Sequence, residues 1–302
     1  MRVAVTGANG RLGRALIAAL GEAPFTGPAG PIAWTRADFD LDAPTSIDVL
    51  LDRDRPEVVV NAAAWTDVDG CARDPKLAMD RNAESVHVLA HATAMRGIDL
   101  IHMSTNEVFD GRRDHDRGYR PEDPAFPGNP YGTSKFAGEV EAAAAYRGRP
   151  ASLGILRTAW LYGPPGNDFP TKILAAAERA RAGGERLKIV GDEFGSPTFT
   201  HDVAEAIVDV LGAYEWRGVF HVVNAGVASR ADWARELFRQ AGMKVEIEEV
   251  PAATWERAST PPAWGVLEAT ELPGREPLRP WQQALADYLP ALMRQRAAAT
   301  PR

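Results

Sequence analysis

The chain has 302 residues, of which 45% are hydrophobic and 25% charged, and its formal net charge is −7. This length and apolar content suffice for a large core in one domain or two coupled domains. The negative charge argues against a nucleic-acid partner, and no apolar run approaches the ~18 residues that span a bilayer. A single cysteine, Cys71, excludes an internal disulfide framework and favours a reducing, cytoplasmic location.

The chain opens on an apolar strand, 2–6, that runs into a turn with glycines at 7, 10 and 13 and then into an apolar helix. In such a turn, backbone N–H groups can approach a pyrophosphate at the helix N-terminus. The spacing is G-x-x-G-x-x-G, and its place between a strand and a helix favours dinucleotide binding over a purely structural turn. The predicted contacts are Gly7, Asn9, Gly10, Arg11, Leu12 and Gly13.

Further short apolar runs bounded by turns predict strands at 32–35, 57–61, 99–104, 152–157 and 219–223. Helical patterns lie between them, for example at 83–96 and 135–146. This alternation predicts an α/β fold with a Rossmann-like, doubly wound parallel sheet and right-handed crossovers.

After residue 163 the pattern loosens into loops rich in Pro and Gly, with helices expected near 172–181, 201–211 and 230–242. We interpret this part as a smaller C-terminal substrate lobe that is interleaved with the first. The expected division is a dinucleotide-binding domain over 1–163, to which a late strand near 218–224 returns. The substrate-binding lobe then covers 164–217 and 225–302.

Tyr131 and Lys135 are four positions apart, so on a helix a phenol and an ammonium point from the same face. A solvated helix face is the alternative interpretation. A free tyrosine, with a pKa of about 10, is a poor proton shuttle at neutral pH, and a nearby ammonium should lower that pKa. Beside a bound dinucleotide the pair predicts general acid–base catalysis. Tyr131 would give its proton to a carbonyl oxygen as hydride arrives from nicotinamide.

Short motifs that occur in the same order in one known enzyme family are found along nearly the whole chain. They are 6–13, 61–69, 82–84, 104–111, 129–132, 135–139, 156–163, 166–169 and 194–198. On these residues the chain resembles the extended short-chain dehydrogenase/reductases, and within them the dTDP-4-dehydrorhamnose reductases and their relatives. The resemblance implies reduction of a keto group on a nucleotide-linked deoxysugar.

The resemblance also implies roles for single residues of the catalytic group. Lys135 would hold the nicotinamide ribose hydroxyls in addition to assisting Tyr131. Thr105, at the end of the fourth strand, would hydrogen-bond the same substrate oxygen as Tyr131. The alternative for Thr105 is an ordinary strand end whose hydroxyl is satisfied by backbone, and Ser104 is the weaker candidate.

Cofactor choice depends on the end of the second strand. An acidic residue about 20 residues past the glycines would accept the ribose hydroxyls of NAD, but the chain has Arg36 there. A guanidinium suits a 2′-phosphate in charge and shape, and Arg11 could reinforce it. We therefore expect NADP(H), with NAD(H) as the alternative in which Arg36 is a solvated loop residue. By resemblance, the cofactor also contacts Ala62, Ala63 and Ala64.

Four residues are expected on the substrate side: Thr66, Asn106, Glu107 and Trp160. Trp160 matches a tryptophan that lines the sugar pocket in dehydrorhamnose reductases, whereas a core aromatic is the alternative. Those reductases usually carry Asp-Tyr where this chain has Asn106-Glu107. The related nucleotide-sugar 4,6-dehydratases carry Asp-Glu, of which the aspartate protonates the leaving hydroxyl and the glutamate removes a ring proton. Asn106 cannot donate a carboxyl proton, so dehydration is not expected, and Glu107 is an extra base or a hydrogen-bond partner.

The loop 111–129 is rich in basic side chains. It is either a lid over an anionic substrate or a solvated loop. The residues concerned are Arg112, Arg113, His115, Arg117 and Arg120.

Three functions remain open, and an NADPH-dependent ketoreductase is favoured. The second is an epimerase or dehydratase of the same fold that keeps its NAD bound, against which Arg36 and Asn106 count. The third is a dinucleotide-binding regulatory subunit without turnover, like the regulatory subunit of methionine adenosyltransferase, which resembles these reductases. The expected partner is a small nucleotide-sugar, with no metal, nucleic acid or membrane. The resemblance allows a homodimer without requiring one.

Overall fold

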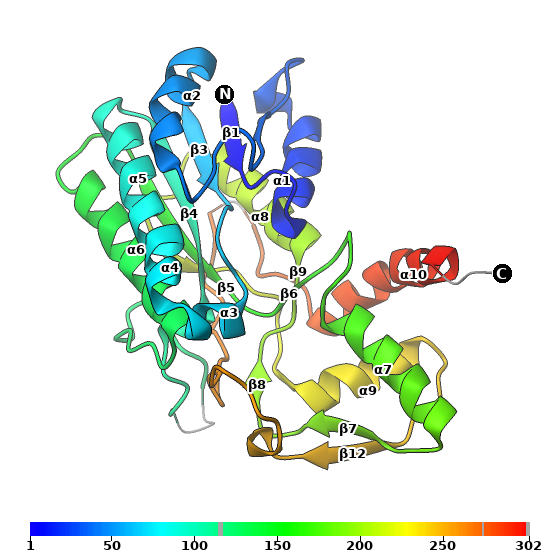
Figure 1. Cartoon of the computed structure of the whole chain (residues 1–302). Coiled ribbons are helices and arrows are strands. Elements are labelled where there is room, and N and C mark those ends of the chain that lie inside the picture. The colour runs from blue at the N-terminus through cyan, green and yellow to red at the C-terminus, as the bar shows by residue number, and fades with distance from the viewer. Residues whose placement is uncertain (114–116, 274, 300–302) are drawn as a thin grey trace.

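The computed structural model describes residues 1–113, 117–273 and 275–299. Its centre is a six-stranded sheet in the order β10-β5-β4-β3-β1-β2 (Figure 1), in which every pairing is parallel. The strands are β1 (Val3–Thr6), β2 (Ile32–Trp34), β3 (Val58–Asn61), β4 (Asp99–Thr105), β5 (Leu153–Thr158) and β10 (Gly218–His221). The six strands and the doubly wound fold predicted from the sequence are confirmed.

Helices cover both faces of this sheet because its strands are apolar on both sides. On one face lie α1 (Arg11–Glu22) and α8 (Thr200–Ala213), whose Leu16 and Ile207 share a core with Val5. On the other face lie α2 (Ile47–Asp54), α5 (Ser85–Met95) and α6 (Pro130–Tyr146), and Leu89 of α5 packs in the same core as Ala4. Alternate residues of one strand therefore point into different cores.

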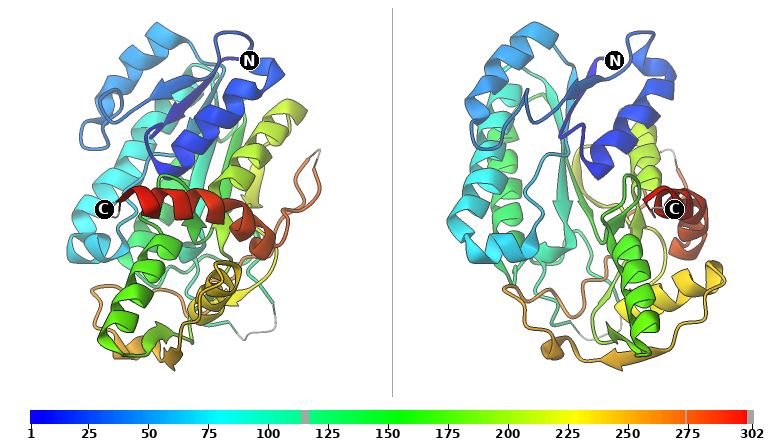
Figure 2. Two further views of the ribbon diagram at one scale, coloured as in Figure 1. Left: turned by 90° about the vertical axis from the view of Figure 1, so that its right-hand side faces the viewer. Right: turned by 45° about the vertical axis from the view of Figure 1, so that its right-hand side comes forward.

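The second lobe has its own core around Trp233, Leu285 and neighbouring apolar side chains. Its helices are α7 (Phe169–Gly183), α9 (Arg230–Gln240) and α10 (Trp281–Ala299), and α10 crosses below α1 in the left view of Figure 2. Short strand pairings complete this lobe or link it to the first. They involve β6 (Leu161–Tyr162) with β9 (Thr198–Phe199), β7 (Leu187–Val190) with β12 (Ile247–Val250), and β8 (Phe194–Gly195) with β11 (Ala228–Ser229), besides single bridges.

Short helices occupy the connections. They are η1 (Pro24–Thr26), η2 (Pro44–Ser46), α3 (Val68–Arg73), α4 (Pro75–Met79), η3 (Asp80–Glu84, a π-helix), η4 (Asn106–Val108) and η5 (Ala252–Thr254). Among the described residues, no helix is long and apolar enough to cross a membrane.

Two features differ from the sequence-based expectation. The range 164–217 is expected in the substrate lobe, but α8 within it packs against α1 and joins the core under the sheet through Val203 and Ile207. The reason is that α8 is the crossover helix that returns the chain to β10. The helix expected at 135–146 begins at Pro130, because Asn129 caps it by accepting a hydrogen bond from the Gly132 N–H.

Candidate active site

The glycine turn leaves the N-terminus of α1 open at the carboxyl edge of the sheet. Gly7 has φ +62°, and a Cβ there would lie 3.0 Å from the backbone nitrogen of Ala63. A Cβ on Gly13 would overlap the carbonyl oxygen of Gly7, so glycine permits α1 to pack closely on β1. The N-cap Gly10 offers no side-chain hydrogen bond, and the first turn of α1 holds no acidic residue. The free N–H groups suit an anion.

A buried row of polar side chains fixes the backbone that faces this turn. The Thr6 hydroxyl donates to Asn61 Oδ1 (2.6 Å) and accepts from the Ala63 N–H (3.1 Å). The Asn61 amide donates to Nδ1 of His102 (3.0 Å), whose pKa burial lowers well below its usual value. This row holds Ala62 and Ala63 beside Gly7, and the contact of residues 62–64 with the cofactor stays a prediction. Polar residues inside otherwise apolar strands are the sequence signal that could have indicated it.

The two arginines expected on the cofactor have different surroundings. Arg36 is exposed, two residues beyond the end of β2. The Arg11 guanidinium instead donates to the carbonyl oxygens of Gly166 (2.9 Å) and Asn167 (3.0 Å) in the loop before α7. The expectation that the Arg11 side chain reinforces a 2′-phosphate site is therefore wrong. Its backbone N–H still belongs to the first turn of α1.

The structure brings Thr105, Tyr131 and Lys135 together at the carboxyl end of β4. Tyr131 lies in the first turn of α6 and is 8% exposed, and Lys135 follows one turn later. Burial and the charge of Glu107 raise the pKa of Tyr131, and its hydrogen bond with Thr105 opposes that rise. The expected lowering of the Tyr131 pKa by Lys135 is thus wrong for this protein. Tyr131 is protonated at neutral pH and can act as an acid.

Lys135 is directed toward the backbone of β4. Its Nζ donates to the carbonyl oxygen of Met103 at 2.8 Å, and its side chain is 2% exposed. Burial lowers the pKa of Lys135 to about 8, while the charge of Glu139 acts in the opposite direction. A cation held at this place lies one helical turn from the phenol, as the spacing predicted.

The residues after Thr105 are anchored more firmly than the sequence suggested. The Asn106 amide donates to the Gly265 carbonyl (3.0 Å), and its oxygen accepts from the Thr105 hydroxyl (3.3 Å). The nitrogen and the oxygen of the Asn106 side chain therefore both have hydrogen-bond partners inside the protein, which disfavours the expected contact with the substrate. Glu107 accepts a hydrogen bond from the Asn129 amide (2.7 Å), and burial raises the pKa of its carboxyl.

The second lobe supplies the opposite wall. Trp160 has φ +44°, its ring stacks with the Trp233 ring at 5.7 Å, and the Arg230 guanidinium lies over it, 3.5 Å from its centroid. Glu193 lies 3.5 Å from Arg230 and 3.6 Å from Arg257. The charges of Arg230 and Arg257 both act to lower the pKa of Glu107, so these two arginines lie on the side of the site that holds Glu107. Sequence reasoning missed Arg230 and Arg257, since nothing local distinguishes them from surface arginines.

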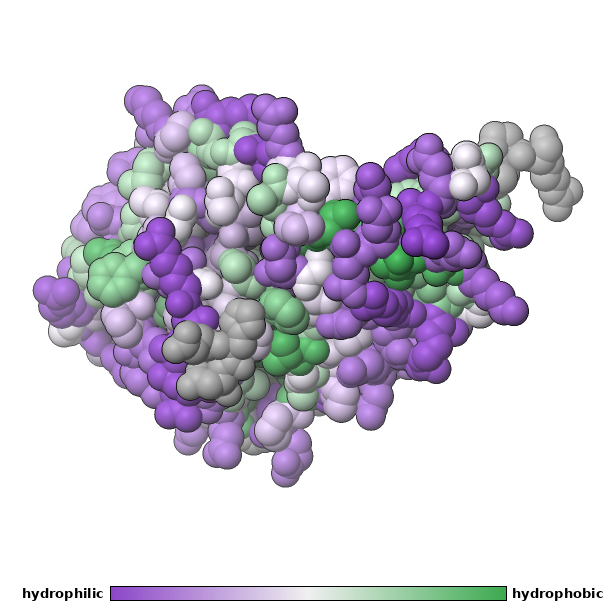
Figure 3. Space-filling model, turned by 90° about the horizontal axis from the view of Figure 1, so that it is seen from below, coloured by the Kyte–Doolittle hydropathy of each residue, from purple (hydrophilic) through white to green (hydrophobic). Residues whose placement is uncertain are grey.

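A cavity of about 1190 Å³ continues from this wall between α7, β7 and residues 252–257. Phe169 and Trp255 are its aromatic lining. Its basic lining residues are Lys172, Arg179, Arg186, Lys188, Arg230 and Arg257, and its acidic ones are Glu185, Glu193, Glu248 and Glu256. Seen from below, the molecule is mostly hydrophilic, with a few hydrophobic residues near the middle of that face (Figure 3). Thr66 is exposed, two residues before α3.

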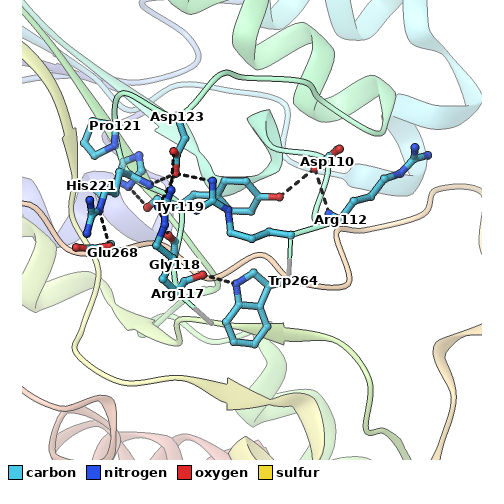
Figure 4. Close-up of polar contacts among 12 residues, drawn as sticks. Asp110, Arg112, Arg117, Gly118, Tyr119, Pro121, Asp123, His221, Trp264 and Glu268 are labelled. Carbon is cyan, nitrogen blue, oxygen red and sulfur yellow. Dashed lines mark hydrogen bonds and ion pairs between the residues drawn. The ribbon is translucent and has the colours of Figure 1, made fainter. Parts of the chain in front are cut away.

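Most cations that the structure describes in the basic loop after β4 are paired with carboxylates. Arg117 and Arg113 each lie 3.0 Å from the Asp123 carboxylate, and Arg120 lies 2.9 Å from Glu268. Figure 4 shows Arg117 and Asp123 next to Tyr119 and His221. His115 lies outside the described residues. The ion pairs of Arg113, Arg117 and Arg120 favour a structural role for these three side chains over binding of an anion.

In the part of the chain that the structure describes, no group of three or more His, Cys, Asp or Glu side chains could hold a metal ion. A doubly wound sheet, a glycine turn after β1 and a buried Tyr131–Lys135 pair on α6 define the extended short-chain dehydrogenase/reductase class.

The chain belongs to the RmlD substrate binding domain family, whose model matches residues 1–294. It is 36% identical to a dTDP-4-dehydrorhamnose reductase of Mycobacterium tuberculosis over 296 residues, covering 96% of this chain and 93% of that protein. It is 37% identical to a dTDP-4-keto-6-deoxy-D-glucose reductase of Streptomyces niveus, covering 95% of this chain and 96% of that protein.

A solved structure shows the same likeness in three dimensions. The crystal structure of a dTDP-4-dehydrorhamnose reductase from Bacillus anthracis in complex with NADP has a TM-score of 0.85 and 28% identity. The match covers 96% of this chain and 99% of that one. The family resemblance inferred from the sequence is confirmed.

Proposed function

We propose that this protein is an NADPH-dependent reductase that acts on the keto group of a dTDP-linked 6-deoxysugar. The observation that carries the proposal is the group of Thr105, Tyr131 and Lys135 beside an open helix N-terminus. Relatives of this chain along nearly its whole length are named as reductases of such sugars.

The residues of the glycine turn and of the strand ends fit a dinucleotide. Gly7, Gly10 and Gly13 allow the turn to fold tightly against the neighbouring backbone, and the N–H groups of Arg11 and Leu12 at the start of α1 would receive the pyrophosphate. Exposed Arg36 beyond the end of β2 suits a 2′-phosphate, and NADP is bound in the related Bacillus anthracis reductase. The bound nicotinamide would supply hydride to the carbonyl carbon.

Tyr131 and Thr105 would handle the oxygen of the same carbonyl. A tyrosine is protonated at neutral pH, and burial and the charge of Glu107 raise the pKa of Tyr131 further. Tyr131 can therefore give its proton to the oxygen as negative charge develops there, while the Thr105 hydroxyl orients that oxygen. The Lys135 ammonium, one helical turn from Tyr131, would hold the hydroxyls of the nicotinamide ribose.

The cavity of the second lobe suits the nucleotide part of the substrate. Trp160 would flank the sugar, and Glu107 would accept a hydrogen bond from one of its hydroxyls. Arg230 and Arg257 supply cations for the diphosphate, and Trp255 supplies an aromatic face for the base. Thr66 is proposed at the mouth of this site.

Dehydration and epimerisation with retained NAD are less compatible with the site. Asn106 has no carboxyl proton to give, and its amide is used to bind Gly265. We further infer a cytoplasmic location, since the only cysteine of the chain is a buried thiol. A homodimer is part of the proposal, and the sedimentation coefficient of the purified protein tests it.

The experiment is NADPH oxidation by the purified protein with dTDP-4-dehydrorhamnose or dTDP-4-keto-6-deoxyglucose, with NADH run in parallel. Oxidation that requires the sugar and prefers NADPH supports the proposal. Tight NADPH binding without turnover on either sugar would contradict it and would favour the regulatory-subunit function.

A further inference from the structure

A buried ion pair lies one helical turn beyond Lys135. Glu139 of α6 is 4% exposed, and its carboxylate accepts from Arg157 Nε (2.9 Å) and Nη2 (2.7 Å). The hydroxyl of Ser104 donates to the same carboxylate at 2.5 Å. Ser104 on β4 and Arg157 on β5 are direct neighbours in the sheet. The carboxylate thus links the catalytic helix to two central strands.

Three polar groups meet here deep in the protein, namely Glu139, Arg157 and Ser104. A buried charge is costly unless it is paired, and here both partners are nearly inaccessible. Ser104 and Arg157 bind one carboxylate of the helix that carries Tyr131 and Lys135. The geometry therefore fixes α6 relative to the end of β4, where Lys135 binds the Met103 carbonyl.

The Glu139–Arg157 ion pair also bears on the charge of Lys135. Glu139 is four residues after Lys135, on the same face of α6. Burial lowers the pKa of Lys135 to about 8, and Glu139 is the charged group that opposes this. Other titratable groups lie on the elements packed around Lys135. They are Tyr131 (α6), Cys71 (α3), Glu107 (η4), His102 (β4) and Arg157 (β5). Burial keeps Tyr131, Cys71 and His102 uncharged at neutral pH.

We propose that Glu139 is a positioning residue of the reductase site. Held by Arg157 and Ser104, its carboxylate keeps the Lys135 ammonium charged and directed at the Met103 carbonyl. The ion pair is then an electrostatic part of the site as well as a structural link between α6 and the sheet. The catalytic consequence rests on the proposed function, but the effect on the charge of Lys135 does not.

The charge of Lys135 can be measured without any substrate. The chain has five lysines, so carbon-labelled lysine gives few NMR signals, and Lys135→Arg identifies the one from Lys135. In the wild-type protein this signal should titrate near pH 8. In Glu139→Gln the midpoint should fall by about one pH unit or more, because the counter-charge is gone. An unchanged midpoint would overturn the proposal.

Glu141→Gln is the matched control. Glu141 lies two residues further on α6 and binds His87 at the surface (2.7 Å), so its removal should leave the Lys135 midpoint in place. An equal fall in both variants would mean that any carboxylate of α6 has the effect, and this would overturn the specific role.

Glu139→Gln leaves Arg157 as a buried, unpaired cation and can fail to fold. The double variant Glu139→Gln with Arg157→Gln removes both charges at similar volume and keeps a hydrogen-bonding pair. We expect it to fold, as judged by its circular dichroism spectrum, with a fall in the Lys135 midpoint that is smaller than in Glu139→Gln, because the opposing charge of Arg157 is removed as well. A folded double variant with the wild-type midpoint would overturn the proposal.

The activity readout separates this inference from the proposed function. If the wild-type protein reduces a dTDP-keto-sugar, the alkaline limb of the kcat profile should move to lower pH in the double variant by the same amount as the NMR midpoint. A uniform loss of kcat at every pH would show a structural role only. If the wild-type protein is inactive, the proposed function fails while the NMR result still decides the role of Glu139.

Discussion

The backbone carbonyl of Glu107 occupies the space that a Cβ on Gly132 would need. Glycine at this position lets the first turn of α6 lie directly against η4. That close approach puts Tyr131, the neighbour of Gly132, beside Thr105, the residue before η4. The Asn129 side chain joins the same two segments, since it caps α6 at the Gly132 N–H and binds the Glu107 carboxyl.

Gly132→Ala should therefore damage both stability and catalysis. The added methyl must push α6 away from η4, which we expect to cost about 2 kcal/mol and roughly 3 °C in Tm. It should also lower kcat by about tenfold or more, because Tyr131 moves from Thr105. Gly128→Ala is the control, since its Cβ would meet only ordinary contacts at 3.7 Å. A fully active Gly132→Ala protein would refute the importance of this contact.

Tyr131→Phe removes the transferable proton and keeps the ring. We expect kcat to fall by about 10²–10⁴-fold, the usual contribution of a general acid. NADPH affinity, measured by fluorescence, should change by less than about twofold, because the nucleotide contacts lie at the glycine turn. Near-normal turnover of this variant would show that another group supplies the proton.

Arg36→Ala tests the cofactor preference. Loss of a charge-assisted contact with the 2′-phosphate should raise the Kd of NADPH by about tenfold and leave that of NADH almost unchanged. Arg239→Ala is a matched control, because Arg239 is an exposed arginine on α9 bound to Glu236. Equal weakening of both cofactors by Arg36→Ala would contradict the assignment.

Trp255→Ala tests where the nucleotide base lies. Trp255 is 49% exposed and lines the cavity, so its ring can stack on a base without a rearrangement of the protein. Stacking of about 1–3 kcal/mol predicts a KM for the dTDP-sugar raised by about tenfold, with kcat little changed. Tyr214→Ala, an exposed aromatic at the end of α8, should have no effect. An unchanged KM would exclude Trp255 from the substrate site.

The raised pKa of the Glu107 carboxyl should make the stability of the folded protein depend on pH. Burial raises the pKa of this carboxyl above the unfolded value of 4.5, so the folded state holds a proton that the unfolded chain has released. This contribution to stability is present below the unfolded pKa and is lost as pH rises through the folded pKa. Glu107→Gln cannot ionise and can still accept from Asn129. Its Tm should exceed that of the wild type at about pH 8, with the gain shrinking toward about pH 4.

Glu268→Gln is the control for that measurement. Arg120 lowers the pKa of Glu268, so the sign is opposite and this variant should gain nothing at neutral pH. A wild-type Tm profile for Glu107→Gln, measured without cofactor, would show that the Glu107 carboxyl is not perturbed by its surroundings.

Local patterns explain why much of the fold and site could be predicted. Strand runs, the glycine turn and the Tyr131–Lys135 spacing are properties of short segments, and α6 and β1 bear them out. The true start of α6 is also encoded locally, because Asn129 before Pro130 is a helix-capping signal that periodicity alone does not contain.

What could not be predicted depends on residues far apart in the chain. The Arg11 side chain binds the carbonyl of Gly166, which lies in the second half of the chain, and Arg230 meets Trp160 only through folding of the second lobe. The pKa of Tyr131 rises because packing buries it next to Glu107, and no spacing rule contains that burial. Arg120 likewise pairs with Glu268, which lies 148 residues further along the chain.

In the proposed reaction, hydride from NADPH reaches the keto carbon of a dTDP-sugar in this site. Its most direct test is turnover with NADPH deuterated at the transferable position, followed by NMR and mass analysis of the sugar. We predict deuterium on the former keto carbon in amounts equal to the NADPH consumed, and almost none with Tyr131→Phe in the same time. NADPH consumption without deuterium in the sugar, or no consumption at all, would contradict this claim.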